Sequence, residues 1–417
     1  MMTQAFYTGL SGLKTNSSGI DIISDNLANV NTVGYRGNTY EFSSLFEDAL
    51  MTTNGTTSDS VGLGTTLQAT PMIESTGSYL LTDRSTDLAI LGDGWFGVQG
   101  DGDPVYTRNG AFSFDSNDDL VTTDGYHVLG TMGGNIDGEV LTQQLDEVPL
   151  ADAGEQEKLR FPKSLTYPAE PTTIAQFSGN IGTVSEVRTM SASVVDPAGV
   201  KNELKLEYTL VDPQIPPGTQ WNVVATTQSL DGETIYDTQS GIVEFDETGA
   251  LVTNTLTSID NNGASVTIDL GTGFDGIVAL SNVDITASSL SNGTIGGELN
   301  GYDINKNGEV IATFTNGMQS SVGKIALYHF QNDQGLSRLS GTNFAQSSNS
   351  GEAFFYKDAA GQNVIGTDMT NYKLEGSNVD MTYGLTELIV LQRSYDANSK
   401  SITTADEMMQ KALDMDA

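Results

Sequence analysis

The sequence predicts a mainly β protein whose N- and C-terminal helices pair as a coiled coil, with β-barrel or sandwich-like domains nested between them. Three observations predict this class. Apolar residues recur at helical spacing near the two ends of the 417-residue chain. The middle consists of short alternating apolar runs separated by turns that contain glycine. Glycine is frequent, with 46 residues, and charged residues make up only 17%, which favours turn-rich β domains over a helical bundle.

The N-terminal helical pattern extends from about Thr3 to Val30 and ends where Val33-Gly34-Tyr35 supplies a glycine stop signal. Its apolar residues follow a 4-3 spacing along one narrow stripe. A narrow stripe of this kind is typical of a coiled-coil seam. The stripe consists of Phe6, Leu10, Leu13, Ile20 and Leu27, with Ser17 and Ser24 filling the gaps.

A second 4-3 stripe lies near the C-terminus, after Ser377-Asn378-Val379-Asp380, which we interpret as a capping box that begins the helix. Because both stripes are narrow and interrupted by polar residues, the two helices are expected to pair with each other and to order fully upon assembly. The alternative is that each helix packs on its own domain. The stripe residues are Leu388, Leu391, Tyr395, Asn398, Ile402, Ala405, Met409 and Ala412.

Between the helical ends, residues 41–76 are rich in Ser, Thr and Gly and are expected to form an extended connector. Hairpin turns are predicted at Gly92-Asp93-Gly94, Asn109-Gly110 and Asp124-Gly125. Residues 143–171, rich in Pro and charge, indicate a domain boundary. Further strands are predicted at 204–211, 241–246, 309–317 and 323–330.

These patterns predict a nested arrangement, in which the ends meet and the central β region is inserted between the flanking ones. The predicted parts are a helical coiled-coil domain of 1–34 and 377–417, an extended connector of 35–76 and 355–376, an inner β domain of 77–150 and 296–354, and an outer acidic β domain of 151–295.

The net charge is −36, from 54 acidic against 18 basic residues. Because nucleic acids and membrane surfaces are themselves anionic, this charge argues against both as partners. No Lys or Arg lies between Lys205 and Lys306, where fourteen acidic residues occur. We interpret this stretch as a well-solvated acidic surface, with a cation-binding face as the alternative.

Other sequence signals limit the chemistry further. No window approaches the roughly 20 continuous apolar residues of a membrane-spanning helix. The start, Met1 to Phe6, lacks the basic and apolar regions of a cleavable secretory signal. The absence of cysteine excludes disulfides and thiolate chemistry, and His127 and His329 are the only histidines available for general-base or metal chemistry.

One stretch has the beginning of a calcium-binding loop. From Asp303 to Glu309 oxygen ligands alternate and the sixth residue is glycine, but the twelfth position is Phe314 instead of glutamate. A hairpin turn at Asn307-Gly308 explains the segment better. A glycosidase carboxylate pair is not excluded by counting, but only Trp95 and Trp221 could line a sugar cleft. We therefore expect no enzyme, and no catalytic, metal-binding or cofactor-binding residue.

The run Asn26-Leu-Ala-Asn-Val-Asn-Thr-Val-Gly-Tyr-Arg-Gly near one end and residues 388–408 near the other form two long, ordered motifs. They resemble the N-terminal and C-terminal signatures of one family, the bacterial flagellar rod and hook axial proteins. Residues 87–97, with Tyr106-Thr-Arg-Asn-Gly, resemble the β domain that follows the N-terminal signature in these proteins. The matching signature positions are Asn26, Asn29, Asn31, Gly34, Tyr35, Gln392, Arg393 and Tyr395.

The middle favours the hook branch of this family over the shorter distal rod proteins. Val194-Val-Asp-Pro-Ala-Gly, Trp221 and Val243-Glu-Phe-Asp resemble the outer domain of hook proteins. The resemblance implies a structural subunit that polymerises into a flexible helical tube. This tube links the basal-body rod to the filament and transmits torque as a universal joint. A distal rod protein, and a secreted β-rich adhesin or glycan-binding protein, are the alternatives.

The resemblance also implies where the chain acts and with what. The expected location is the extracellular hook, reached through the flagellar type III export apparatus without a cleaved signal. The expected partners are other copies of the chain, the distal rod protein, the hook cap protein and the hook–filament junction protein, with no cofactor. The expected assembly interface consists of Phe6, Leu10, Leu13, Ile20, Leu27, Leu388, Leu391, Tyr395, Ile402 and Met409.

Overall fold

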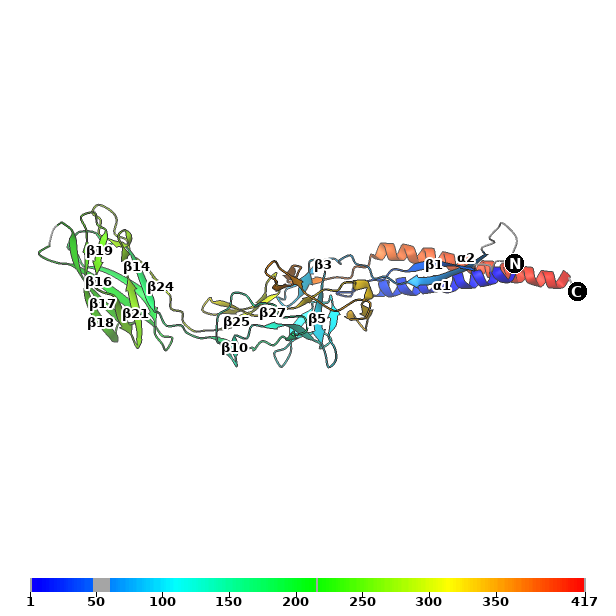
Figure 1. Cartoon of the computed structure of the whole chain (residues 1–417), viewed down its shortest axis with the longest axis horizontal. Coiled ribbons are helices and arrows are strands. Elements are labelled where there is room, and N and C mark those ends of the chain that lie inside the picture. The colour runs from blue at the N-terminus through cyan, green and yellow to red at the C-terminus, as the bar shows by residue number, and fades with distance from the viewer. Residues whose placement is uncertain (1, 48–60, 215–216, 416–417) are drawn as a thin grey trace.

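The computed structural model describes residues 2–47, 61–214 and 217–415. The chain is elongated, with two helices at one end, an inner β domain in the middle and an outer β domain at the other end (Figure 1). Both termini lie at the helical end, so the chain runs out to the outer domain and returns. The predicted class, mainly β with paired terminal helices, is confirmed.

The terminal helices are α1 (Met2–Ala28) and α2 (Met381–Met415), and they lie side by side (Figure 1). A Cβ atom added to Gly384 would lie 3.1 Å from Leu27 Cδ2, and one added to Gly9 would lie 2.8 Å from Ile402 Cγ1. The end of α1 therefore contacts the start of α2, and the pair is antiparallel.

The start of α2 differs from the predicted capping box. Asp380 Oδ1 accepts hydrogen bonds from the backbone N–H groups of Thr382 at 2.8 Å and Tyr383 at 3.0 Å, so Asp380 is the N-cap, three residues after Ser377. The Asn378 side chain is the physical reason. It accepts a bond from Gly37 N and donates to two backbone carbonyls of residues 73 and 75, which holds this segment outside the helix.

The expected extended connector contains a hairpin. Strands β1 (Glu41–Glu47) and β2 (Val61–Ala69) pair antiparallel and lie along α1 (Figure 1). Thr15 Oγ1 donates to Thr65 O at 3.0 Å, and Thr65 N donates to Ser11 Oγ at 3.2 Å. Serine and threonine, whose abundance predicted a connector, thus form hydrogen bonds that attach the hairpin to α1. Residues 48–60 of the predicted connector lie outside the described residues.

The inner β domain surrounds one hydrophobic core that includes Trp95, Phe96, Phe161 and Tyr328. Its short strands come from both arms of the chain, and β5, β9 and β27 form its centre. The strands are β3 (Tyr79–Leu81), β4 (Leu88–Ile90), β5 (Trp95–Gln99), β6 (Val105–Thr107), β7 (Phe112–Phe114), β8 (Leu120–Thr122), β9 (His127–Met132), β10 (Ile136–Asp137), β11 (Val140–Leu141), β12 (Glu157–Lys158), β13 (Thr166–Tyr167), β25 (Gly297–Ile304), β26 (Glu309–Phe314), β27 (Gln319–Ile325), β28 (Leu327–Tyr328), β29 (Ser337–Arg338), β30 (Asn343–Ala345), β31 (Tyr356–Lys357), β32 (Asn363–Val364), β33 (Met369–Asn371) and β34 (Lys373–Glu375), with a 3-10 turn η1 (Asp333–Gly335).

The inner domain extends beyond the limits predicted for it. Leu159, Phe161 and Tyr167 lie in its core, so residues 151–171 pack here and not in the outer domain. Phe355, Ile365 and Met369 lie in this core as well, and strands β33 and β34 pair with β4 and β3, which brings residues 355–375 into the same domain. In both segments a few apolar side chains spaced along irregular backbone enter the core, and this burial outweighs their linker-like composition.

The suspected calcium loop is the turn between β25 and β26. Asn305 Oδ1 accepts hydrogen bonds from Asn307 N at 2.9 Å and from Glu309 N at 3.0 Å, which close the predicted hairpin turn. Gly308 has φ +72°, as such a turn requires.

Buried His329 of the inner domain leads to a pH prediction. Its Nε2 lies 2.8 Å from Ile365 O, and Asp93, Asp333 and Arg108 are the charged groups that act on it. Burial lowers the pKa of His329 below its usual 6.5. In the unfolded chain the imidazole has its ordinary pKa, so it takes up a proton at a higher pH than in the folded chain. The free energy of unfolding is therefore expected to fall as the pH drops below about 6.5. Urea unfolding of the wild type and of His329→Gln at about pH 7 and pH 5 tests this. An equal loss of stability in both proteins would contradict the assignment.

The outer β domain is a two-sheet unit with a separate core that includes Phe177, Tyr208 and Trp221. One sheet has the antiparallel order β15-β16-β17-β18-β19, and the other has the order β20-β21-β14-β23-β22 with β24 beside β14. Alternating buried and exposed residues along β16 and β17 explain the sandwich. The strands are β14 (Ile174–Asn180), β15 (Arg188–Val195), β16 (Lys201–Leu210), β17 (Thr219–Ser229), β18 (Ile235–Phe245), β19 (Leu251–Asn254), β20 (Ser258–Asn261), β21 (Ala264–Asp269), β22 (Gly271–Thr272), β23 (Asp275–Val278) and β24 (Ser288–Ser291).

Two chain segments join the outer domain to the inner one (Figure 1). They are held together by two backbone hydrogen bonds: Glu170 N–H donates to Thr294 O at 2.8 Å, and Thr294 N–H donates to Glu170 O at 2.9 Å. Side chains around this crossing are mostly exposed. A two-segment connection with so little packing offers little resistance to bending.

Candidate assembly interface and the joint that positions it

Over residues 9–19, the face of α1 that meets α2 is a row of glycines, and farther along the helix Ile23 and Leu27 lie against Gly384 of α2. A Cβ atom added at Gly12 would lie 2.7 Å from Asn398 Nδ2, and one added at Gly19 would lie 3.1 Å from Leu391 Cδ1. Gly9 continues this row toward the N-terminus. Because these residues have no side chain, the two helix backbones approach closely, and the partner side chains of α2 fill the space.

A second face of α1 is covered by the hairpin. A Cβ atom at Gly64 of β2 would lie 1.8 Å from Ser11 Oγ, and the Phe42 ring of β1 approaches Gly19. Tyr40 stacks on Phe42 with ring centroids 4.7 Å apart, and its hydroxyl donates to Glu387 of α2. The hairpin therefore binds both helices and holds them as one unit.

The predicted apolar stripe of α1 lies on a third face. Phe6 is 37% exposed and Leu10 is 52% exposed, while Leu13, Ile20 and Leu27 are half-buried. Of these, Leu27 contacts α2. The stripe is turned by about 100° around the helix from the glycine row, so most of it does not form the contact between the two helices. The stripe therefore forms an apolar surface of α1 that is partly exposed to solvent in the single chain.

The predicted stripe of α2, in contrast, contacts α1. Leu391 is buried against Gly19, and Ile402 lies against Gly9. Leu388 and Met409 are half-buried, and Tyr395 is 40% exposed. Further apolar side chains of α2 lie outside the stripe and are exposed. Their spacing did not mark them in the sequence, and only their apolar residue type could have indicated them. They are Met381, Tyr383, Leu385, Ile389, Val390, Met408, Leu413 and Met415.

Three of the signature residues form the joint between the helices and the inner domain. Asn26 Nδ2 donates to Asn38 O at 2.7 Å, and Asn26 Oδ1 accepts from Asn38 N at 3.0 Å. The Tyr35 hydroxyl donates to Asp25 Oδ2 at 2.9 Å. Burial, together with this bond, raises the pKa of Tyr35 to about 12. Gly34 completes the joint.

The other signature residues have separate positions. Asn29 Nδ2 donates to Asp25 O at 2.9 Å, which caps the end of α1. Asn31, Gln392 and Arg393 are exposed and are not brought together with the joint.

Gly34 is where the chain from α1 passes against the inner domain. Its N–H donates to Glu375 O at 2.7 Å, and its φ is +70°. A Cβ atom here would lie 2.4 Å from Asn109 N and 2.7 Å from the Arg108 carbonyl carbon. Since these are backbone atoms, no side-chain movement can relieve the clash.

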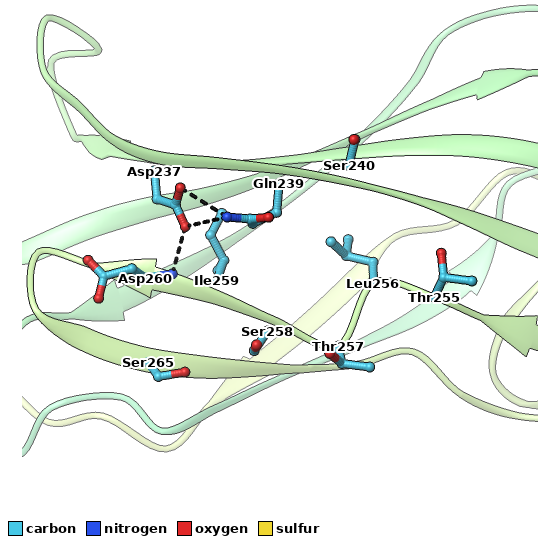
Figure 2. A pocket seen from close by; sticks show the side chains of 10 residues that line it. All are labelled: Asp237, Gln239, Ser240, Thr255, Leu256, Thr257, Ser258, Ile259, Asp260 and Ser265. Atoms are coloured by element: carbon cyan, nitrogen blue, oxygen red, sulfur yellow. Dashed lines mark hydrogen bonds between the residues drawn. The ribbon is translucent and has the colours of Figure 1, made fainter.

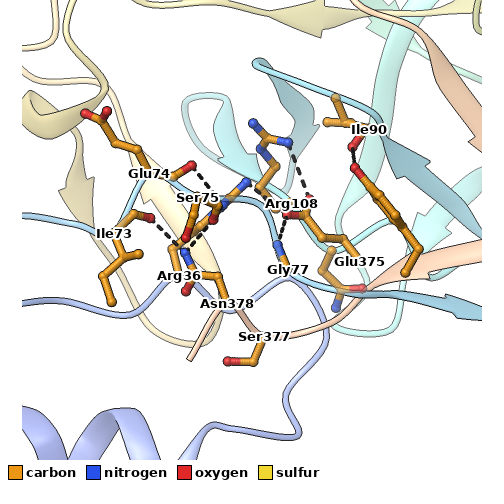
Figure 3. Close-up of polar contacts among 12 residues, drawn as sticks. Arg36, Ile73, Glu74, Ser75, Gly77, Ile90, Arg108, Glu375, Ser377 and Asn378 are labelled. Carbon is orange, nitrogen blue, oxygen red and sulfur yellow. Dashed lines mark hydrogen bonds and ion pairs between the residues drawn. The ribbon is translucent and has the colours of Figure 1, made fainter. Parts of the chain in front are cut away.

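A buried charge cluster lies at the same joint (Figure 3). Glu375 Oε1 lies 2.9 Å from Arg36 Nη2, and Glu375 Oε2 lies 3.4 Å from Arg108 Nη1. Gly77 N donates to Glu375 Oε1 at 3.0 Å. All three charged side chains are almost fully buried. Burial, and then the charge of Arg36, lower the pKa of Arg108 to about 10.

This cluster joins three distant segments of the chain. Arg36 follows α1, Arg108 follows β6 and Glu375 precedes α2, so no local pattern in the sequence signals it. Arg338 adds a fourth segment: its guanidinium lies 5.0 Å from the Tyr35 ring centroid and donates to Arg36 O. The joint therefore sets the direction in which the helices leave the inner domain.

The outer domain has a polar hollow between β18 and β20 (Figure 2). In it, Asp237 Oδ2 accepts from Asp260 N at 3.1 Å and from Gln239 Nε2 at 3.1 Å. The ten residues that line the hollow include no aromatic side chain. Ligand pockets are usually lined by apolar and aromatic groups, so the hollow gives no support to the glycan-binding alternative.

Two further features bear on the excluded classes. Within 2–47, 61–214 and 217–415, no group of three or more His, Asp or Glu side chains is placed to hold a metal ion. Neither α1 nor α2 is long and apolar enough to cross a membrane, as judged on the helical residues that the structure describes.

Comparison with known proteins identifies the family. Three family models match: "Flagella basal body rod protein" at residues 6–36, "Flagellar hook protein FlgE/F/G D1 domain" at 89–166 and "Flagellar basal body rod FlgEFG protein C-terminal" at 371–415. The Flagellar hook protein FlgE of Brucella suis is 30% identical, with 96% of each chain covered. The chain belongs to the flagellar hook protein family.

Other relatives agree with this assignment. Flagellar hook protein FlgE of Borreliella burgdorferi is 28% identical over 98% of this chain and 99% of its own, and that of Salmonella typhimurium is 28% identical over 97% and 98%. The fold is similar to a crystal structure of the Helicobacter pylori flagellar hook protein FlgE2, with TM-score 0.54 and 17% identity. That match covers 71% of this chain and all of the solved one.

These relatives decide between the sequence-based alternatives. They are hook proteins matched over nearly their whole length, central domains included, so a distal rod protein is not favoured. The chain is a flagellar hook subunit, and its family is structural.

Proposed function

We propose that copies of this chain polymerise through their terminal helices into the flexible tube of a bacterial flagellar hook, which joins the rod to the filament and transmits torque. The observation that supports this most directly is the apolar stripe of α1 left open by the antiparallel pair. An apolar face on a helix that is already packed on two other sides needs a partner outside the chain.

The joint gives this surface a defined direction. With Arg36, Arg108 and Glu375 buried together, the helical unit cannot rotate on the inner domain without exposing or separating charges. In a tube, each copy would then present its helices to its neighbours at the same angle.

The connection to the outer domain supplies flexibility. The crossing of Glu170 and Thr294 has little packing around it, so the outer domain can change its angle while the inner parts keep their contacts. The acidic outer domain would face solvent, where like charge prevents neighbouring outer domains from locking together.

We propose the same four-part division, with residues 151–171 and 355–375 moved into the inner domain. Expected partners beyond other copies are the distal rod protein, the hook cap protein, the hook–filament junction protein and the type III export apparatus. The expected place is the extracellular hook, without a cleaved signal. We propose a purely structural role with no catalysis. That the helical ends order fully upon assembly stays a prediction.

Replacing Leu10 by glutamate is expected to impair polymerisation while the single chain stays folded. Leu10 is 52% exposed, so the monomer tolerates the charge, but an interface would bury it without a partner. The critical concentration for assembly, measured by sedimentation, should rise at least about tenfold.

The matched control is Leu230→Glu, which adds the same charge at a 63% exposed leucine in the outer domain. It should assemble as the wild type does. If Leu10→Glu assembled as readily as this control, the α1 stripe would not be the interface.

A further inference from the structure

A second open apolar surface lies on the inner domain, on the two-stranded ribbon of β3 and β34. All three residues of β3 are exposed: Tyr79, Leu80 and Leu81, the last at 82%. Tyr372, next to β34, is exposed as well. A leucine this exposed on an edge strand favours aggregation unless another surface covers it.

The backbone of β3 is open too. Ser78 O accepts from Gly376 N at 2.7 Å and Thr82 N donates to Tyr372 O at 2.9 Å, which places these residues in the hydrogen-bonded positions of the antiparallel pair. Tyr79 and Leu81, in the alternate positions, therefore turn their N–H and C=O groups away from β34. β3 pairs with no other described strand, so this edge is free to accept a further strand or loop.

Two features indicate that the ribbon is a contact surface. Tyr372 has φ +55°, a left-handed conformation that costs a bulky residue about 1 kcal/mol or more and is concentrated at functional sites. Lys373, opposite Leu81 in the ribbon, forms no ion pair with any residue that the structure describes. Lys373 is therefore one of several positive charges that stay available for an acidic partner, in a chain with 54 acidic and 18 basic residues.

We propose that the β3–β34 ribbon is a second contact surface between copies of this chain, which docks by its free edge, Leu81 and Lys373 on an acidic neighbour. The inference rests on the proposed function. A second copy is the occupant that the charges favour, because its net charge of −36 complements Lys373. The ribbon also lies close to the helices along the chain, since only residues 376–380 separate β34 from α2.

The absence of cysteine allows a direct test. In Leu81→Cys, the only thiol of the chain reports on the ribbon, and its reaction with a maleimide is followed by mass spectrometry in the monomer and in sedimented tubes. The thiol should react readily in the monomer and at least about tenfold more slowly in the tube. Leu230→Cys is the control for access of the reagent to the tube.

A second arm uses charge. Leu81→Glu should raise the critical concentration for assembly several-fold over Leu230→Glu, which changes the net charge equally. Equal assembly of the two variants, or a thiol at position 81 that reacts as fast in tubes as in monomers, would overturn the proposal while leaving the proposed function intact.

Other outcomes identify other causes. Protection found only in hooks isolated from cells, and not in tubes of the purified chain, would assign the ribbon to a different protein and overturn the self-contact. Failure of the unmodified chain to form tubes at all would overturn the proposed function and this inference with it.

Discussion

Replacing Glu375 by alanine is expected to destabilise the joint by about 3–5 kcal/mol, because it leaves the buried guanidinium groups of Arg36 and Arg108 close together without a counter-charge. The loss should appear in the inner domain and at the base of the helices. The outer domain, which has its own core, should be unaffected. Urea unfolding followed by hydrogen-exchange mass spectrometry separates these regions.

Glu352→Ala is the matched control, since Glu352 is an exposed glutamate of the same domain. Its effect should stay within about 0.5 kcal/mol. A more demanding control replaces the cluster as a whole with Arg36→Met, Arg108→Met and Glu375→Leu. This triple variant should lose less stability than Glu375→Ala, because no unpaired charge remains buried. If the single variant proved the milder of the two, the charges would not be what stabilises the joint.

Replacing Gly34 by alanine is expected to cost about 2–5 kcal/mol. About 1–2 kcal/mol of this comes from the left-handed backbone, and the rest from the contact between the new Cβ atom and the backbone of Asn109. The chain must shift to relieve the clash, so the helices should detach from the inner domain. Limited proteolysis at residues 34–38, together with urea unfolding, measures both effects.

Gly134→Ala separates strain from clash. Gly134 has φ +66°, close to the φ of Gly34, but a Cβ atom there would have no neighbour within 4 Å. This control should cost only the backbone term of about 1–2 kcal/mol and leave the helices attached. Equal losses in the two variants would show that the close approach of the joint to Asn109 has no energetic role.

The glycine row of α1 shows where sequence periodicity stops being informative. Spacing located the helix and selected the stripe of Phe6, Leu10, Leu13 and Ile20 by its apolar side chains. Leu27 at the end of the stripe contacts α2, but over residues 9–19 the contact is made through Gly9, Gly12 and Gly19, which a search for apolar residues overlooks. A row of small residues becomes a packing surface only when a second helix supplies the side chains that fill it.

The domain limits failed for a related reason. Residues 151–171 have the composition of a linker, yet Phe161 and Tyr167 lie in the core of the inner domain. Residues 35–76 also have it, yet Thr65 O accepts a hydrogen bond from Thr15 of α1. Composition averages over a window, whereas packing depends on the few side chains that reach a core or a helix. The start of α2 was displaced in the same way, because the Asn378 side chain is hydrogen-bonded to two other segments, at Gly37 and at residues 73–75.

By itself, the sequence determined the helical ends, the β middle, the family and the residues of its signatures, because these depend on local spacing and on ordered motifs. Only the tertiary structure decided what those residues do. It placed Asn26, Gly34 and Tyr35 in a joint beside a buried cluster of Arg36, Arg108 and Glu375, whose members are separated by up to most of the chain. It also left the apolar stripe of α1 and the β3–β34 ribbon open. Local periodicity contains no information about which distant segment covers a surface, and so none about which surfaces stay free for another copy.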